Sequence, residues 1–406
     1  MTMVKRWSGR ETLALRQALR MSSRRFAAHL GVNERTVTNW EARGGAIHPR
    51  PELQAALDTA LRRAGDETRS RFEQLLHAVP EARAVDTDAI GLSDDIPPTT
   101  AIRTRIDRSD VLVVRTMLDA LTASDRQFGG GHARHLAVGY LRNVVWPCLH
   151  AAGRESAVQD MTVVGAEFIL RTAAMTLDAG NAGGCRRLLM VAASLADRAD
   201  DPSLTAWVLA RRGEYEIYLR SPAKALAYAA GAAAMARSMS PGVKAFLLAK
   251  YALALSLQPA GDQSARRVID EALDASGHIE DQEPRWMSSY GIGHVRHDES
   301  RCYANLGLGE RAVAAVDEAI RAGDRTRHAR PMAFSLGIRA IGHARAGDVE
   351  QACVTGHELL DLTARISSVR ARSRVAEVLE VLRPHRDVAS VRDLYEAARP
   401  VLTAGT

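Results

Sequence analysis

Residue types that carry covalent or metal chemistry are few in this chain and lie far apart. The four cysteines form no CxxC pair, so their spacing supports neither a disulfide framework nor a zinc site. Unpaired cysteines are among the residues most often buried in folded proteins. We therefore expect buried free thiols at Cys148, Cys185, Cys302 and Cys353.

Two further patterns invite a chemical interpretation. His294 and His297 are three apart and could ligate a metal from one helix face, but no third ligand is obvious. Residues 129–131 are a triple glycine, yet no Lys-Ser/Thr follows it and no strand precedes it, which favours a loop between two helices over a phosphate-binding loop. GxSxG, HExxH, Walker A and GxGxxG motifs are absent. We expect no enzymatic activity, no metal and no cofactor.

The most informative polar residues lie instead near the N-terminus, in MSSRRFAAHLGVNERTVTNWE. Ser22 or Ser23 can cap a short helix that ends at Leu30. Gly31 supplies the left-handed turn that a corner between two helices requires, and Asn33 can cap the second helix. The pattern predicts two short helices joined by a tight turn.

Helical periodicity gives this segment an inner and an outer side. Ala27 lies four residues before Gly31, where two helices that cross near a right angle must approach closely. The apolar residues expected in the core of the corner are Phe26, Leu30, Val32, Val37 and Trp40. The outer face of the second helix is then left with Glu34, Arg35, Thr38, Asn39 and Ala42.

Further helices are expected on both sides of the corner. Ser8 followed by Glu11 is a capping-box pattern and marks the start of a preceding helix. The amphipathic stretch PELQAALDTALRRAG begins at Pro51 and is expected to run on into ETRSRFEQLLHAV. Residues 8–79 are thus predicted to form one small helical domain.

The stretch RRFAAHLGVNERTVTNWEAR resembles the helix-turn-helix of the Cro/phage-repressor (XRE) family of transcription regulators. Ala27, Gly31, Val37 and Trp40 match the four characteristic positions of that family. The resemblance covers about residues 8–64. One departure is at the start of the first motif helix, where the family often has Gln and this chain has Ser23 followed by Arg24.

The resemblance implies that residues 33–43 form a helix that enters the major groove of double-stranded DNA. Arg35 would then reach O6 and N7 of guanine, and Asn39 would reach N6 and N7 of adenine. Thr38 would touch a thymine methyl group or a phosphate, and the basic residues would contact phosphates. The full set of implied DNA-binding residues is Arg24, Arg25, Asn33, Glu34, Arg35, Thr38, Asn39 and Arg43.

The charge distribution agrees with an anionic partner for the N-terminal part. The chain carries a net charge of +6, and residues 1–79 alone hold 14 Lys and Arg against 8 Asp and Glu. Excess positive charge attracts phosphates. No apolar run has signal-peptide length or approaches the roughly 20 residues of a membrane span. We expect a cytoplasmic protein without a membrane partner.

The middle of the chain is expected to be a linker followed by helices. Residues 80–107 lack helical periodicity and include Pro97-Pro98 and an acidic patch, which predicts a flexible linker. Helical periodicity resumes in DVLVVRTMLDALTAS, which Ser109 can cap. Residues 108–164 are predicted to form a helical segment that caps a repeat domain.

A repeat is visible from about residue 165 to 366. Small residues recur at Cys185, Ala225, Ala265, Ala312 and Ala352, with gaps of 40, 40, 47 and 40 residues. A second series lies seven residues after each of these positions. A third series, five residues before each, marks the end of the preceding helix. Small residues seven apart lie on one helix face, where a neighbouring helix must approach closely.

This pattern resembles the tetratricopeptide repeat, in which antiparallel helix pairs stack into a superhelix. Two departures are a period near 40 instead of about 34 and the absence of most of the signature aromatics. About five repeats are expected, and a sixth pair can end the array around residues 386–402. The predicted fold is all-α, with a helix-turn-helix domain and an α-solenoid over residues 165–406; a non-repeating helical bundle is the alternative.

The gap of 47 predicts an insertion at residues 277–297, which carries Trp286 and Tyr290. Insertions in such arrays map to loops, often on the binding face. The positions that the family uses on its concave face correspond here to Glu214, Tyr218, Lys250, Gln258, His297, Arg301 and Asn305. With Tyr290 they form the predicted ligand or partner site, and an ordinary solvated face is the alternative.

The sequence favours a DNA-binding transcription regulator that forms a homodimer through its helical body. Regulators of this build resemble the peptide-responsive regulators of Gram-positive bacteria, so the repeat domain is expected to sense a peptide, a small molecule or a protein. The competing hypothesis is a protein-interaction scaffold that does not bind DNA.

Overall fold

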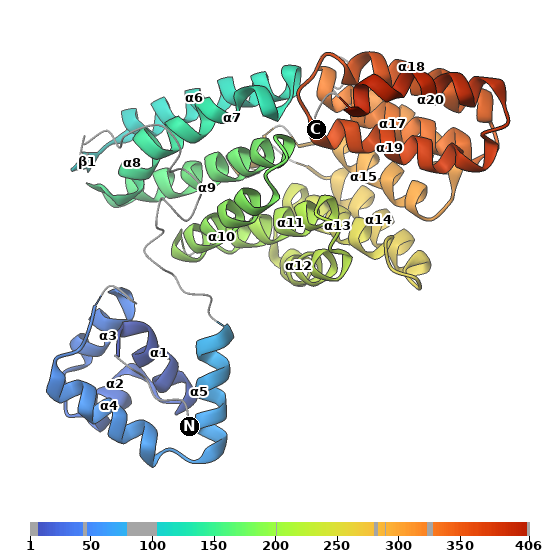
Figure 1. Ribbon diagram of the computed structural model, residues 1–406. Coiled ribbons are helices and arrows are strands. Elements are labelled where there is room, and N and C mark those ends of the chain that lie inside the picture. Colours follow the sequence, from blue (N-terminus) through green and yellow to red (C-terminus); the bar gives the residue numbers. More distant parts are fainter. Residues whose placement is uncertain are drawn as a thin grey trace. The chain divides into compact units, whose positions relative to one another are not determined.

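A computed structural model describes residues 7–43, 47–78, 104–199, 201–279, 283–288, 290–322 and 328–403, without the side chains of residues 10, 42, 43 and 73–78. The described chain is almost wholly helical (Figure 1). It divides into two compact units, Met1–Ala89 and Ile90–Thr406. No helix in the described part is long and apolar enough to cross a membrane.

The first unit consists of short helices around a small apolar core. Its helices are α1 (Gly9–Ala18), α2 (Ser23–Leu30), α3 (Glu34–Arg43), α4 (Pro51–Arg63) and α5 (Asp66–Ala78). The largest buried side chains in the core are Trp7, Leu15, Phe26, Val37, Leu57 and Phe72. Leu30 and Val32, expected inside the core, pack against it while half-buried.

The corner between α2 and α3 has the predicted local geometry. The Ser22 side chain accepts a hydrogen bond from the Arg25 amide and caps α2. Gly31 ends α2 with φ 69° and ψ 30°, a left-handed conformation that costs glycine little. The Asn33 Oδ1 atom accepts from the Arg35 amide at 2.9 Å and caps α3.

The prediction of one continuous helix from Pro51 was wrong. The backbone leaves the helical conformation at Ala64, whose ψ is 140°, and a second helix starts after Gly65. α5 packs back on α1, where Arg71 Nη1 donates to the Ala18 carbonyl at 2.8 Å. An amphipathic pattern cannot distinguish one long helix from two helices that share an apolar face.

The second unit begins with a strand and three helices. The two-residue strand β1 (Arg105–Ile106) pairs in parallel with β2 (Ala152–Gly153), so the end of the predicted linker is structured; residues 80–103 of that linker lie outside the described residues. The helices are α6 (Arg108–Phe128), α7 (Gly130–Tyr140), which continues into a π-helical turn (Leu141–Val145), and α8 (Trp146–His150).

The capping residue of α6 differs from the one expected. Asp107, not Ser109, caps this helix, and its carboxylate accepts from the Ser109 and Asp110 amides. The Asp110 side chain accepts in return from the Asp107 amide, which completes a capping box. Ser109 lies within the first turn, one position inside the helix.

Helices α9 to α20 form six antiparallel pairs in chain order (Figure 1). The pairs are α9 (Glu155–Asp178) with α10 (Ala182–Ala199), α11 (Pro202–Tyr218) with α12 (Pro222–Met235), α13 (Pro241–Leu255) with α14 (Asp262–Ser276), α15 (Ile292–Asn305) with α16 (Gly309–Ala322), α17 (Ala329–Arg345) with α18 (Val349–Thr363), and α19 (Val369–Leu382) with α20 (Ala389–Thr403). The boundary predicted at residue 165 falls inside α9.

The small residues of the sequence repeat lie where helices meet. All five positions of the first series are fully buried in the second helix of their pairs, at Cys185, Ala225, Ala265, Ala312 and Ala352. The second series, seven residues later, is equally buried, at Ala192, Ala232, Ala272, Ala319 and Leu359. Four of the five positions in the third series have positive φ, at Gly180, Arg220, Gly307 and Gly347. They form the tight turns inside the pairs.

The third pair departs from this pattern. α13 ends at Leu255 and α14 begins at Asp262, so residues 256–261 form a longer connection than the three residues that join the helices of the neighbouring pairs. The predicted insertion follows this pair, between α14 and α15. Its residues 283–288 include the 3₁₀ turn Arg285–Met287. Its last residues, from Ile292, belong to α15 instead of a loop.

The end of the array returns to its beginning. α17 packs against α6, and α19 packs against α9. The Ser367 amide donates to the Phe128 carbonyl at 2.8 Å, and the Gly131 amide donates to the Ser367 carbonyl at 3.0 Å. A Cβ on Gly129 would lie 2.4 Å from that carbonyl oxygen, and its φ is 85°. The triple glycine thus permits close backbone contact between segments far apart in sequence.

Gly31→Ala tests the corner of the first unit. We expect it to lower the local stability of α2 and α3 by about 1–2 kcal/mol, because alanine is strained at φ 69°. Hydrogen exchange of the full chain measures this loss. Gly65→Ala is the matched control, since Gly65 lacks a positive φ and has no atom near its Cβ position. Equal losses in both variants would contradict the assignment.

Candidate functional site

The outer face of α3 presents a group of exposed polar side chains. Arg35, Thr38 and Asn39 are exposed together on this helix, while Val37 and Trp40 are buried on its opposite side. Of the other predicted DNA-binding residues, those that are exposed are Arg24, Arg25, Asn33 and Glu34. The side chain of Arg43 lies outside the described residues.

An ion pair that sequence reasoning missed holds α3 in place. Arg16 Nε on α1 lies 2.6 Å from Glu41 Oε1 on α3, and Arg16 Nη1 donates to the Met21 carbonyl at 2.9 Å. Both side chains are mostly buried, at 18% and 14% exposure. Since Glu41 is mostly buried, Glu34 is the exposed carboxylate of α3. The sequence gives no signal for the pair, because its members are 25 residues apart.

The guanidinium groups of this face are available to a ligand. Among the residues that the structure describes, Arg24, Arg25 and Arg35 form no ion pair. The Arg35 guanidinium can donate two hydrogen bonds to a planar group, and the Asn39 amide can donate one and accept one. The face is therefore suited to a partner that offers many hydrogen-bond acceptors.

The second unit contains a polar cavity of about 600 Å³. It is lined by side chains from α6, α9, α11, α13, α15, α16, α17 and α19 and by residues that precede α15 and α17. The predicted residues that the structure brings together here are Glu214, Tyr218, Lys250, Tyr290, His297 and Arg301.

Two predicted residues lie elsewhere. Asn305 lines a neighbouring cavity of about 480 Å³, which shares Tyr218 and Arg301 with the first, and its amide donates to Ser256 Oγ at 2.9 Å. Gln258 lines neither cavity, and its side chain donates to the carbonyl of Ala254 in α13. The longer connection in the third pair explains this, because Gln258 falls after the end of α13 instead of within it.

Glu214 and Asp298 form the centre of one buried ionic network. Lys250 Nζ lies 3.0 Å from a Glu214 oxygen and 2.8 Å from an Asp298 oxygen. Arg211 donates to Glu214 at 2.8 Å. Arg301 lies farther away, 3.9 Å from Glu214 and 3.7 Å from Asp298. The network joins α11, α13 and α15.

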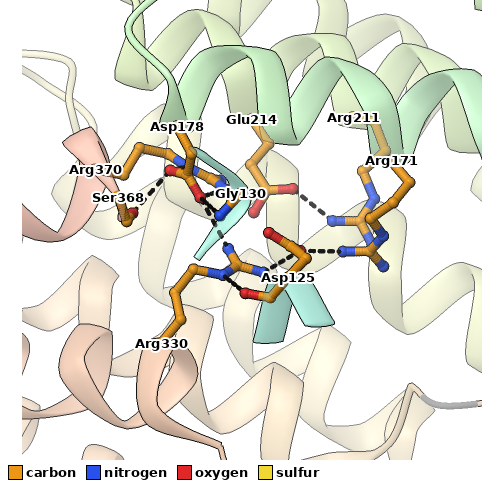
Figure 2. Close-up of polar contacts among 9 residues, drawn as sticks. All are labelled: Asp125, Gly130, Arg171, Asp178, Arg211, Glu214, Arg330, Ser368 and Arg370. Carbon is orange, nitrogen blue, oxygen red and sulfur yellow. Dashed lines mark hydrogen bonds and ion pairs between the residues drawn. The ribbon is translucent and has the colours of Figure 1, made fainter. Parts of the chain in front are cut away.

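Asp125 and Asp178 form the centre of a second network (Figure 2). Arg370 donates to both oxygens of Asp178, at 2.6 and 3.0 Å, and the Ser368 hydroxyl donates to the same carboxylate at 2.9 Å. Arg330 donates to Asp125 Oδ2 at 2.6 Å and approaches Asp178 to 3.8 Å. We call the pairs Asp125–Arg330 and Asp178–Arg370 the closure ion pairs, because they join α6 and α9 to α17 and α19.

The cations of these networks keep the buried carboxylates ionised. Burial alone would raise the pKa of Asp178, but Arg370, Arg330 and the Ser368 hydroxyl together hold the pKa below its ordinary value. Burial opposes ionisation of Glu214 as well, and Lys250, Arg211 and Arg301 outweigh it, so its pKa is also lowered. Both side chains are negatively charged at neutral pH.

Aromatic rings complete the lining. The guanidinium carbons of Arg301 and Arg370 lie 5.3 and 5.2 Å from the ring centroid of Tyr218. Beside the cavity, Trp286 of the predicted insertion stacks on Trp207 of α11, with ring centroids 4.7 Å apart. The insertion contributes to the cavity wall through Ser288 and Tyr290. The repeat register predicted Tyr218 and Arg301 as site residues, but it did not predict Arg370.

The described residues were also compared with the side-chain groups that metal binding and thiol chemistry require. They contain no group of three or more His, Cys, Asp or Glu side chains able to hold a metal ion. All four cysteines are free and buried, as expected. Burial raises the pKa of Cys185 to about 12, so its thiol stays protonated at neutral pH.

Comparison with known proteins gives no relative. No protein-family model matches the chain, and no curated protein matches its sequence.

Asp178→Asn tests the closure ion pairs. We expect the free energy of unfolding to fall by about 3–5 kcal/mol at neutral pH, because Arg370 would keep a buried charge without its partner. The lowered pKa of Asp178 stabilises the fold above the ordinary Asp pKa of about 3.9 and loses this effect as the pH falls through the folded-state pKa. The difference between variant and wild type should therefore shrink in acid, as urea unfolding at several pH values would measure.

Asp262→Asn is the matched control for that measurement. Asp262 pairs with Arg266 at 2.5 Å on the surface of α14, with 57% of its side chain exposed. Its replacement should cost less than about 1 kcal/mol. A similar cost for Asp178→Asn would show that the closure ion pairs do not hold the ends of the array together.

Proposed function

We propose that the chain is a cytoplasmic, sequence-specific DNA-binding transcription regulator whose helical repeat domain senses an effector and forms a homodimer. The observation that carries the proposal is the joint exposure of Arg35, Thr38 and Asn39 on α3, whose Val37 and Trp40 are buried on the opposite side and which follows the turn at Gly31. This is the geometry expected of a helix-turn-helix of the Cro/phage-repressor type.

In this proposal α3 is the recognition helix. Arg35 and Asn39 would contact base edges in the major groove, and Thr38 would contact a thymine methyl group or a phosphate. Arg24 and Arg25, exposed on α2, would bind the phosphate backbone. The excess of 14 Lys and Arg over 8 Asp and Glu in residues 1–79 adds the long-range attraction that such proteins use.

The second unit would act as the sensor. Its paired helices, with small buried residues at equal offsets, agree with a tetratricopeptide-like array. Because the cavity is lined by residues from eight different helices, a ligand that fills it would shift their relative positions. In a dimer this shift would change the distance between two recognition helices, which must match half-sites about 34 Å apart.

Arg35→Ala and Asn39→Ala test the DNA-binding role. We expect each to weaken binding of the full chain to its selected sequence by about 1–3 kcal/mol, because each removes one base-edge contact. The sequence would be selected from a random duplex library, and affinity measured by gel shift. Wild-type binding should also weaken steeply as the salt concentration rises.

Arg267→Ala is the charge-matched control, since Arg267 is exposed on α14 and pairs only with Glu271 in the described part of the chain. It should bind the selected DNA like the wild type. If no sequence is enriched, or if all three variants bind equally well, the DNA-binding role is wrong. The protein-interaction scaffold would then be the better account.

A further inference from the structure

The cavity of the second unit contains more cations than carboxylates. Six cationic side chains belong to the two networks and line the cavity: Arg171, Arg211, Lys250, Arg301, Arg330 and Arg370. Four carboxylates pair with them: Asp125, Asp178, Glu214 and Asp298. Among the described residues, two positive charges in these networks are therefore left without a matching negative charge.

Arg301 is the clearest case of this excess. Its side chain is only 6% exposed, and it makes no hydrogen bond to any other residue that the structure describes. The two carboxylates within 4 Å, Glu214 and Asp298, are both held closer by Lys250. A buried guanidinium with unused donors is costly unless an acceptor reaches it. Its side chain lines this cavity and the neighbouring one, and the polar cavity of about 600 Å³, where the other cations lie, offers room for an acceptor.

We propose that this cavity binds a small organic dianion, with two carboxylates or one phosphate monoester, and that Arg301 is its principal hydrogen-bond donor. Two negative charges would balance the excess of the two networks. Guanidinium groups bind carboxylate and phosphate oxygens in pairs, which suits the unused N–H groups of Arg301. Tyr218, which contacts both Arg301 and Arg370, offers a flat apolar surface beside the charged end of the ligand.

The size of the cavity favours a small molecule over a peptide. A volume of about 600 Å³ lies within the range of small-molecule sites. The closure ion pairs also tie α6 and α9 to α17 and α19 beside the cavity. An extended peptide that ran between these helices would have to displace Arg330 or Arg370 from its carboxylate.

The chemistry of the ligand follows from the cavity alone, whereas its role as an effector rests on the regulator function proposed above. A dianion at Arg301 would lie between α15 and the arginines of α17 and α19. It would add contacts between the middle and the end of the array and so stabilise the closed arrangement. Ligand binding can be measured without DNA, which separates the two proposals.

The test uses the full chain and isothermal titration calorimetry with four probes. Glutarate and phenyl phosphate represent the two sources of a dianion, glutaramide is the uncharged control, and tetra-aspartate represents an acidic peptide. We expect at least one dianion to bind and to slow hydrogen exchange in α13 and α15, and glutaramide not to bind. Arg301→Gln should weaken the dianion by about tenfold or more, because a charge-assisted contact is lost.

Arg267→Gln is the matched control and should leave the affinity unchanged, because Arg267 lies on the outer surface of α14. If Arg301→Gln does not fold, Arg126→Gln replaces it, since Arg126 lines the same cavity from α6. The proposal is overturned if neither dianion binds, if the cavity variant binds as tightly as the control, or if only tetra-aspartate binds.

Discussion

The architecture of the second unit depends on one buried carboxylate. Asp178 ends α9 and is 1% exposed, and it accepts hydrogen bonds from Arg370, Ser368 and the Gly130 amide. The end of α9, the start of α7 and the start of α19 thus meet at a single side chain. A buried carboxylate must satisfy its oxygens within the protein, so these segments have to come together for the unit to fold. The walls of the cavity are a consequence of this requirement.

The same requirement determines which cations remain for a ligand. Asp178 and Asp125 pair with Arg370, Arg330 and Arg171 (Figure 2). Glu214 pairs with Lys250 and Arg211, and Asp298 pairs with Lys250. Buried ion pairs of this kind add little net stability compared with apolar packing, but they can specify one arrangement of the elements. Here they specify a closed array in which Arg301 is left facing an interior space. The same buried ion pairs therefore hold the helices together and leave Arg301 available to the proposed ligand.

Local features of both units could be predicted from the sequence, because they depend on residues a few positions apart. The caps by Ser22 and Asn33 and the turn at Gly31 follow from backbone geometry that few residue types satisfy. The buried small residues of the helix pairs follow from helical periodicity in the same way. The closure ion pairs could not be predicted, since their members are 205 and 192 residues apart and a charged residue is ordinarily read as exposed. Gln258 was misplaced for a related reason: a repeat register assumes equal connections, and the third pair breaks that assumption.

The two candidate sites use the same type of residue in opposite environments, and this difference indicates different partners. The arginines of α2 and α3 are exposed and form no ion pair within the described residues, so they can exchange water and counterions for the phosphates of a long polyanion at little cost. The arginines of the cavity are held by carboxylates and other neighbours at fixed positions, so they can accept only a ligand whose charge and size match the space between them. Exposed arginines suit the binding of a long polyanion, and buried arginines suit the binding of one small anion. The burial of the cation, more than its identity, decides what each site can bind.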